Sequence, residues 1–149
     1  MTTFNNQDLQ SKFDENGYIA INPLFSIDKI EEIKIELSRY IKDVSPNVPD
    51  HHIFYENKDD KTTIKQRQQM FTYDDYFKKL IENSPIREVA EIVLREKAQP
   101  KNLQFFNKPP GIGKPTPPHQ DGYYFMLKKH NAVTRSEERR VGKECRSRW

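Results

Sequence analysis

The chain has 149 residues, of which 34% are hydrophobic and 32% charged, and its formal net charge is +3. This length suits one domain with a core of its own. No apolar run approaches the roughly 20 residues needed to cross a bilayer, and the N-terminus lacks a basic-then-apolar signal pattern. The composition therefore argues against a membrane protein and predicts a cytoplasmic protein without a membrane partner.

The first half of the chain predicts helices around short extended segments. Asn16-Gly17 is a turn signal, and the alternating run at residues 18–21 predicts a strand. Ser26 is a natural N-cap for a helix that Pro46 should end. We expect the polar residues 45–65 to form a loop that covers a site. The apolar stripe of the helix predicts a core-facing side and consists of Ile27, Ile30, Ile33, Leu37, Tyr40 and Ile41.

The second half predicts two more helices and then strands. Thr72 with Asp75 makes a capping-box pattern, and Ser84-Pro85 opens the next helix with a cap and a first-turn proline. Beyond residue 100 we expect extended segments at 102–107 and 122–128, joined by a proline-rich loop. Helices first and strands late are typical of an α+β fold, in which a helical layer packs on a largely antiparallel sheet.

The last 15 residues differ from the rest in composition. Residues 135–149 hold six basic and three acidic side chains, together with the only cysteine and the only tryptophan, whereas residues 1–134 hold 19 of each charge. We interpret 1–134 as the N-terminal part of a domain and 135–149 as a non-native, adapter-like tail. The alternative is a native basic tail that contacts nucleic acid, but the neutral body favours a protein without a nucleic-acid partner.

A short motif carries most of the chemical information. Lys108-Pro109-Pro110-Gly111 is followed by His119-Gln120-Asp121. On an extended segment, side chains two residues apart share a face, so the imidazole of His119 and the carboxylate of Asp121 lie together. They would supply two ligands of the 2-His-1-carboxylate triad of non-heme Fe(II) oxygenases. A bare His-x-Asp pair beside a proline loop also occurs as ordinary surface residues.

The residues that flank this motif point to a family. The block FDENGYIAI at residues 13–21, the helix opening FSID at 25–28, and the blocks NKPPG at 107–111 and PHQDGYYF at 118–125 resemble the phytanoyl-CoA dioxygenase family. The resemblance covers about residues 4–134. It implies a double-stranded β-helix (jelly-roll) core, here truncated, beneath the helical layer.

The resemblance also implies a site and an activity. His119 and Asp121 would be iron ligands, and Gln104, Lys108 and Tyr124 would line the pocket of the co-substrate 2-oxoglutarate. An Fe(II)- and 2-oxoglutarate-dependent dioxygenase couples decarboxylation of 2-oxoglutarate to hydroxylation of a small-molecule or acyl substrate by O2. Lys108 and Gln104 could also be an ordinary solvated lysine and an ordinary strand glutamine.

Two residues that the family pattern requires are not recognisable in this sequence. The family places a second histidine and a 2-oxoglutarate-binding arginine well after the His-x-Asp strand, and His130 follows Asp121 too closely to be that histidine. We therefore expect a family fragment that is inactive as it stands. The alternative functions are a non-catalytic remnant that acts as a binding module and a nucleic-acid-binding protein that uses its basic tail.

Overall fold

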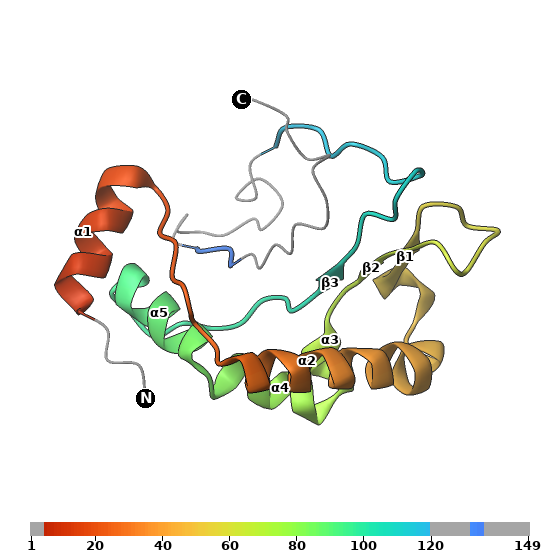
Figure 1. The fold of residues 1–149 in the computed structure, drawn as a ribbon, viewed down its shortest axis with the longest axis horizontal. Helices are drawn as coiled ribbons and strands as arrows, with labels where there is room; N and C mark the ends of the chain where they lie inside the picture. Colours follow the sequence, from red (N-terminus) through yellow and green to blue (C-terminus); the bar gives the residue numbers. More distant parts are fainter. Residues whose placement is uncertain (1–4, 120–131, 136–149) are drawn as a thin grey trace.

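The computed structural model describes residues 5–119 and 132–135, which form an α+β arrangement of helices beside a small antiparallel sheet (Figure 1). This confirms the predicted fold class. The described sheet has three strands and does not close, so the predicted jelly roll stays a prediction. In chain order the elements are α1 (Asn6–Asn16), α2 (Ile27–Arg39), η1 (Tyr40–Val44), η2 (Ser45–Asn47), η3 (Asp50–His52), β1 (Ile53–Tyr55), β2 (Ile64–Arg67), α3 (Met70–Tyr73), α4 (Asp75–Glu82), α5 (Pro85–Leu94) and β3 (Phe105–Phe106).

Helix α1 begins and ends with caps that its sequence supplies. The Asn5 side chain accepts a hydrogen bond from the Asp8 N–H, and Gly17 adopts φ +73° while its N–H donates to the Phe13 carbonyl at 2.8 Å. Asn16-Gly17 is thus a helix end, because glycine enters the left-handed region without a Cβ penalty. The predicted strand at residues 18–21 is wrong. Residues 18–21 pair with no strand in the described part of the chain, and an extended segment becomes a strand only beside a partner.

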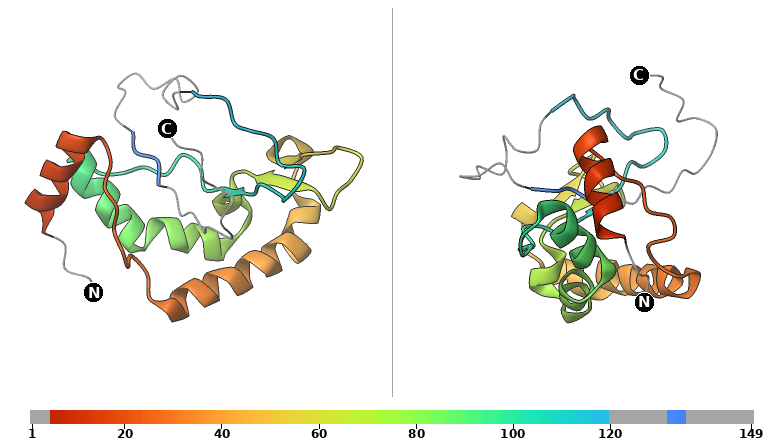
Figure 2. Two further views of the ribbon diagram at one scale, coloured as in Figure 1. Left: turned by 45° about the horizontal axis from the view of Figure 1, so that its top comes forward. Right: turned by 90° about the vertical axis from the view of Figure 1, so that its left-hand side faces the viewer.

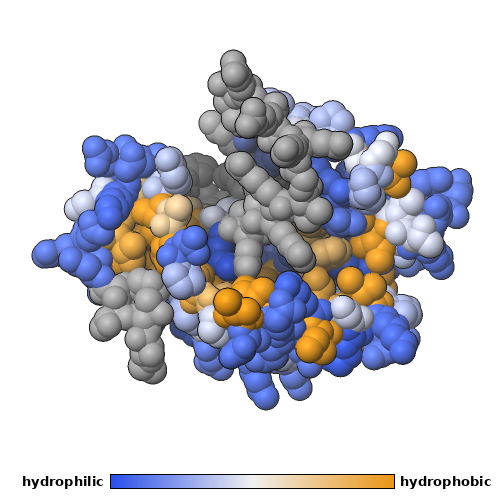
Figure 3. Space-filling model, in the orientation of Figure 1, coloured by the Kyte–Doolittle hydropathy of each residue, from blue (hydrophilic) through white to orange (hydrophobic). Residues whose placement is uncertain are grey.

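Helix α2 begins at the predicted cap. The Ser26 hydroxyl accepts from the Lys29 N–H at 3.2 Å. The helix then runs into the π-helical η1 and the 3₁₀-helical η2, so helical structure reaches the predicted end at Pro46. The predicted core stripe is only partly correct, since Ile27 is 82% exposed. Figure 3 shows apolar groups among the hydrophilic side chains along the lower edge of the view, where α2 lies in Figure 1.

Residues 45–65 are not the predicted loop. They contain β1 and lead into β2, and the two strands pair antiparallel with Phe54 opposite Gln66. Strand β3 then joins the other side of β2, with Gln66 opposite Phe106 and Arg67 opposite Phe105. Two of the three strands therefore precede α3, α4 and α5, and the predicted order of helices first and strands late is wrong. The sheet unites segments that lie about 40 residues apart in sequence.

The caps of α4 and α5 lie where short polar side chains meet the first turn. The Asp74 carboxylate accepts from the N–H groups of Tyr76 at 3.0 Å and Phe77 at 3.3 Å, so Asp74, and not the predicted Thr72, caps α4. The Ser84 hydroxyl accepts from the Ile86 N–H at 3.3 Å, which confirms the predicted start of α5. Helix α1 packs beside α5 (Figure 2), where the Gln10 side chain donates to the Ile92 carbonyl at 2.8 Å.

The core lies between the α2–η1 segment, α4 and the inner face of the sheet. The ring of Tyr40 meets Phe77 edge-on with centroids 5.4 Å apart, and Met70 is as deeply buried as Tyr40. Burial raises the pKa of the Tyr40 hydroxyl to about 12. Partly buried side chains from the sheet, Ile53 and Phe105, complete the cluster from the other side. The core therefore fixes one face of the sheet and leaves the opposite face available for a site.

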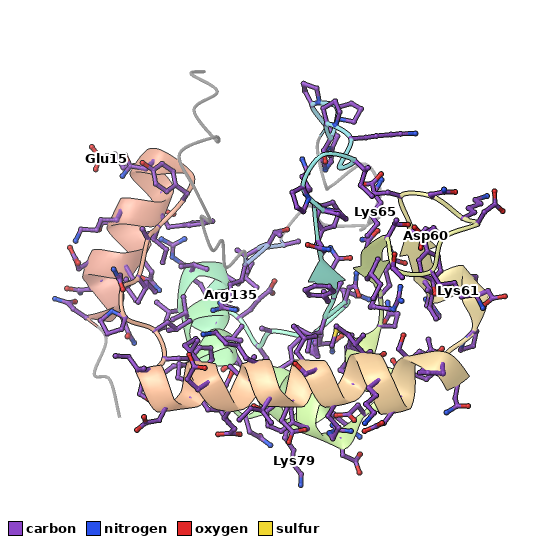
Figure 4. The ribbon with its side chains drawn as sticks, turned by 45° about the vertical axis from the view of Figure 1, so that its right-hand side comes forward. Glu15, Asp60, Lys61, Lys65, Lys79 and Arg135 are labelled. Atoms are coloured by element: carbon purple, nitrogen blue, oxygen red, sulfur yellow. The ribbon has the colours of Figure 1, made fainter. Side chains whose placement is uncertain are left out.

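The short described segment at residues 132–135 lies against the helical layer. The Arg135 guanidinium lies over the Phe25 ring, 5.5 Å from its centroid (Figure 4), in the range of cation–π contacts. The boundary between residues 134 and 135 stays a prediction. None of the helices in the described part of the chain is long and apolar enough to cross a membrane.

Candidate functional site on the outer face of the sheet

His119 lies at the end of the proline-rich loop that follows β3. It is exposed, and its Nδ1 lies 2.9 Å from the Pro117 carbonyl oxygen. A carbonyl oxygen only accepts hydrogen bonds, so Nδ1 is the donor in this contact, and in the neutral imidazole Nε2 then carries the lone pair. Metal-binding histidines commonly hold their second nitrogen in this way. The ring therefore has the tautomer that a ligand bonding through Nε2 requires.

The other predicted ligand lies outside the described residues. Asp121 belongs to the segment 120–131, as does Tyr124 from the predicted co-substrate pocket, so neither is placed. Within residues 5–119 and 132–135, no three histidine, cysteine, aspartate or glutamate side chains gather into a metal-binding group. The chemistry of the donor set nevertheless fits iron, because imidazole and carboxylate are the ligands of non-heme Fe(II) sites. The iron ligands therefore stay a prediction.

Lys108 lies at the start of a closed turn directly after β3. The Gly113 N–H donates to the Pro109 carbonyl at 2.9 Å. A Cβ on Gly113 would lie 2.9 Å from that oxygen and 3.3 Å from the Lys108 Cβ, so the turn needs glycine there. Lys108 itself is exposed. The turn brings residues 109–113 back onto Lys108 and fixes the backbone from which its ammonium group extends.

Gln104 is held by two side chains that the sequence did not single out. The Gln66 Nε2 donates to the Gln104 Oε1 at 2.6 Å, and the Asn102 Nδ2 donates to the same oxygen at 3.0 Å. Gln66 comes from β2, and Asn102 precedes β3. Residues 63–67 contain only one apolar side chain, Ile64, so the sequence carries no alternating signal for a strand that would have singled out Gln66. Figure 4 marks this hairpin by Asp60 and Lys61, with Lys65 on β2.

These side chains share the outer face of the sheet. Phe54, Gln66 and Phe106 form a row across the three strands, because each lies opposite the next in the register. Gln104 is two residues before Phe106 and so points to the same side in extended backbone. Phe54 and Phe106 are exposed. We call Phe54, Gln66, Gln104 and Phe106 the glutamine face.

The inner face anchors this arrangement through a buried arginine. Arg67 is 4% exposed, and its guanidinium donates to the Ser45 hydroxyl at 2.7 Å and to the Gln66 carbonyl at 3.2 Å. It also lies over the Tyr55 ring, 4.9 Å from the centroid. A planar guanidinium serves several acceptors at once, so Arg67 ties η2 to the sheet. The strand that carries Gln66 is thus held in place from the opposite face of the sheet.

The chain was compared with protein families, curated proteins and solved structures. The family model described as phytanoyl-CoA dioxygenase (PhyH) matches residues 13–141. No curated protein matches the chain significantly, and no solved structure does. The family match includes the glutamine face, Lys108 and the His119-Gln120-Asp121 motif. Because it spans most of the 149 residues, the chain belongs to the phytanoyl-CoA dioxygenase family.

Proposed function

We propose that the chain provides part of the active site of an Fe(II)- and 2-oxoglutarate-dependent dioxygenase that hydroxylates a small-molecule or acyl substrate with O2. The observation that carries the proposal is the family match across residues 13–141, which contains the His-x-Asp motif at the end of the proline-rich loop that follows β3. His119 and Asp121 are the proposed iron ligands. Gln104, Lys108 and Tyr124 are the proposed contacts of 2-oxoglutarate.

The chemistry of His119 and of Lys108 suits the role proposed for each. His119 offers Nε2 to a metal because its Nδ1 is engaged with the Pro117 carbonyl. Lys108 carries a point charge that attracts a carboxylate. When bound, the iron supplies the oxidative chemistry that couples decarboxylation of 2-oxoglutarate to hydroxylation, and the protein contributes binding and orientation.

The proposal includes groups beyond those identified in these 149 residues. The second histidine and the arginine of the family pattern would complete the iron site and pair with the far carboxylate of 2-oxoglutarate. We therefore propose that residues 1–134 are the N-terminal part of the catalytic domain and that the chain by itself is inactive. Lengthening the coding sequence beyond codon 134 from the source DNA should restore a histidine and an arginine, and with them turnover.

Iron binding tests the proposal directly. Anaerobic Fe(II) titration, followed by calorimetry, should show one site in the chain that is lost in both His119→Ala and Asp121→Ala. Matched controls are His51→Ala and Asp59→Ala, which remove an exposed histidine and an exposed aspartate elsewhere. Equal Fe(II) affinity of all five proteins would refute the assignment and favour a non-catalytic binding module. In the lengthened protein, 2-oxoglutarate-dependent release of carbon dioxide should disappear with the same two substitutions only.

A further inference from the structure

The amide oxygen of Gln104 accepts two hydrogen bonds. Gln66 and Asn102 both donate to Oε1, at 2.6 Å and 3.0 Å. Among residues 5–119 and 132–135, no acceptor takes a hydrogen bond from the Gln104 amide nitrogen. A primary amide has an acceptor end and a donor end. The two donors therefore fix the amide oxygen of Gln104 toward Gln66 and Asn102 and leave its two N–H bonds turned away from them.

The pairing is a consequence of the sheet register. Gln66 lies directly opposite Phe106 on β3, and Gln104 is the diagonal neighbour two residues earlier. Diagonal cross-strand neighbours are within reach of long side chains. The register is held on both sides of this pair. On one side Asn107 donates its N–H to the Lys65 carbonyl at 2.7 Å and its side chain to the Ile64 carbonyl at 3.0 Å, and on the other the Met70 N–H donates to the Leu103 carbonyl at 2.9 Å. The contact between the two glutamines thus follows from ladder geometry that neither side chain itself creates.

We infer that Gln66 is a positioning residue for the 2-oxo acid site, in which it and Asn102 orient the Gln104 amide so that its N–H groups donate to an oxygen of 2-oxoglutarate. This inference rests on the proposed function, which places Gln104 in the co-substrate pocket. The ligand chemistry agrees, since 2-oxoglutarate has carboxylate and keto oxygens that only accept hydrogen bonds. An amide free to turn over would present its oxygen to those acceptors for part of the time.

Two substitutions at the same position separate orientation from bulk. Gln66→Met keeps the length of the side chain but removes the donor, so the Gln104 amide can turn over. Gln66→Lys keeps a donor at the end of a side chain of similar length and should hold the Gln104 oxygen inward. Gln68→Met is the matched control, because it removes a glutamine amide next to β2 that is not bound to Gln104.

Two measurements report on the inference. In ¹⁵N NMR spectra of the unliganded chain, the side-chain amide signals of Gln104 should change chemical shift in Gln66→Met, and their protons should exchange faster with solvent. Neither change should occur in Gln68→Met. Calorimetric titration with 2-oxoglutarate in the presence of anaerobic Fe(II) should show about tenfold weaker binding for Gln66→Met, as expected for the loss of one hydrogen bond to a charged group. Binding by Gln66→Lys and Gln68→Met should stay within roughly threefold of the unmodified chain, which corresponds to less than about 0.7 kcal/mol.

The outcomes distinguish the inference from the function on which it rests. If the unmodified chain binds 2-oxoglutarate and Gln66→Met binds it equally well, the positioning role is overturned while the proposed function stands. If Gln68→Met weakens binding as much as Gln66→Met, the effect is a general loss of the sheet and the inference is again overturned. If the unmodified chain and the lengthened protein both fail to bind 2-oxoglutarate, the proposed function is overturned and the inference with it.

Discussion

Replacing Asp74 by alanine should destabilise the domain more than any other single change of a helix cap in the described residues. One oxygen of its carboxylate caps α4 through the N–H groups of Tyr76 and Phe77, and the other accepts from Arg39 at 2.7 Å. The Asp74 side chain is only 7% exposed, whereas that of Arg39 is 37% exposed. The residue therefore joins α2 to α4 in addition to starting α4.

The magnitude follows from these two roles. Loss of an N-cap costs about 1 kcal/mol, and loss of a partly buried hydrogen bond between charged groups costs a further 1.5–3 kcal/mol or so. Asp74→Ala should therefore lower the free energy of unfolding by roughly 3 kcal/mol, or the midpoint temperature by roughly 10 °C for a domain of this size. Asp74→Asn should cost about half as much, because asparagine remains a good N-cap but loses the charge.

The assay is urea unfolding of the two variants beside Asp75→Asn, which neutralises the exposed first residue of α4. That control should cost less than about 0.5 kcal/mol, as surface substitutions usually do. The expected order of stability places Asp75→Asn first, Asp74→Asn second and Asp74→Ala last, with equal m-values. If Asp74→Ala were as stable as Asp75→Asn, the reasoning that assigns Asp74 both a capping and a linking role would be refuted.

Three further changes test the fold. Burial and the neighbouring His51 lower the pKa of His52, so the folded state binds fewer protons there and stability falls as the pH drops through about 6.5; His52→Phe should flatten this part of the stability–pH curve, and an unchanged slope would contradict the assignment. Gly17→Ala should cost about 1 kcal/mol in urea unfolding, because alanine is strained at φ +73°. Arg67→Lys should cost roughly 2 kcal/mol, since one ammonium group cannot replace the contacts to Ser45 and the strand carbonyls, and a cost below about 0.5 kcal/mol would show that these contacts do not stabilise the sheet.

The sequence predicted the elements whose signals are local. Ser26 and Ser84 were recognised as caps, because a hydroxyl just before an apolar periodic stretch has its partner within three residues. The capping-box pattern correctly located the start of α4 but pointed to Thr72, whereas Asp74 supplies the cap. The family was recognised from contiguous blocks, and the family match confirms it.

The predictions failed where pairing partners are distant in sequence. The run at residues 18–21 alternates like a strand but has no neighbour to pair with among the described residues. Strand β1 reads as part of a polar loop, yet it pairs with β2 and thereby joins β3. Whether an extended segment forms a strand depends on the segment beside it. Here the packing of the core between Tyr40, Phe77 and the inner face of the sheet determines which segments lie side by side.

The same division applies to the candidate site. The order of residues alone determined that an imidazole follows a proline-rich turn and precedes a carboxylate by two positions, because spacing of this kind is a covalent property. Only the tertiary structure decided that Gln66 meets Gln104, since 38 residues separate them and the register of β2 against β3 brings them together. Local chemistry is encoded along the backbone, whereas the orientation of one amide by another depends on packing that no short stretch of the chain contains.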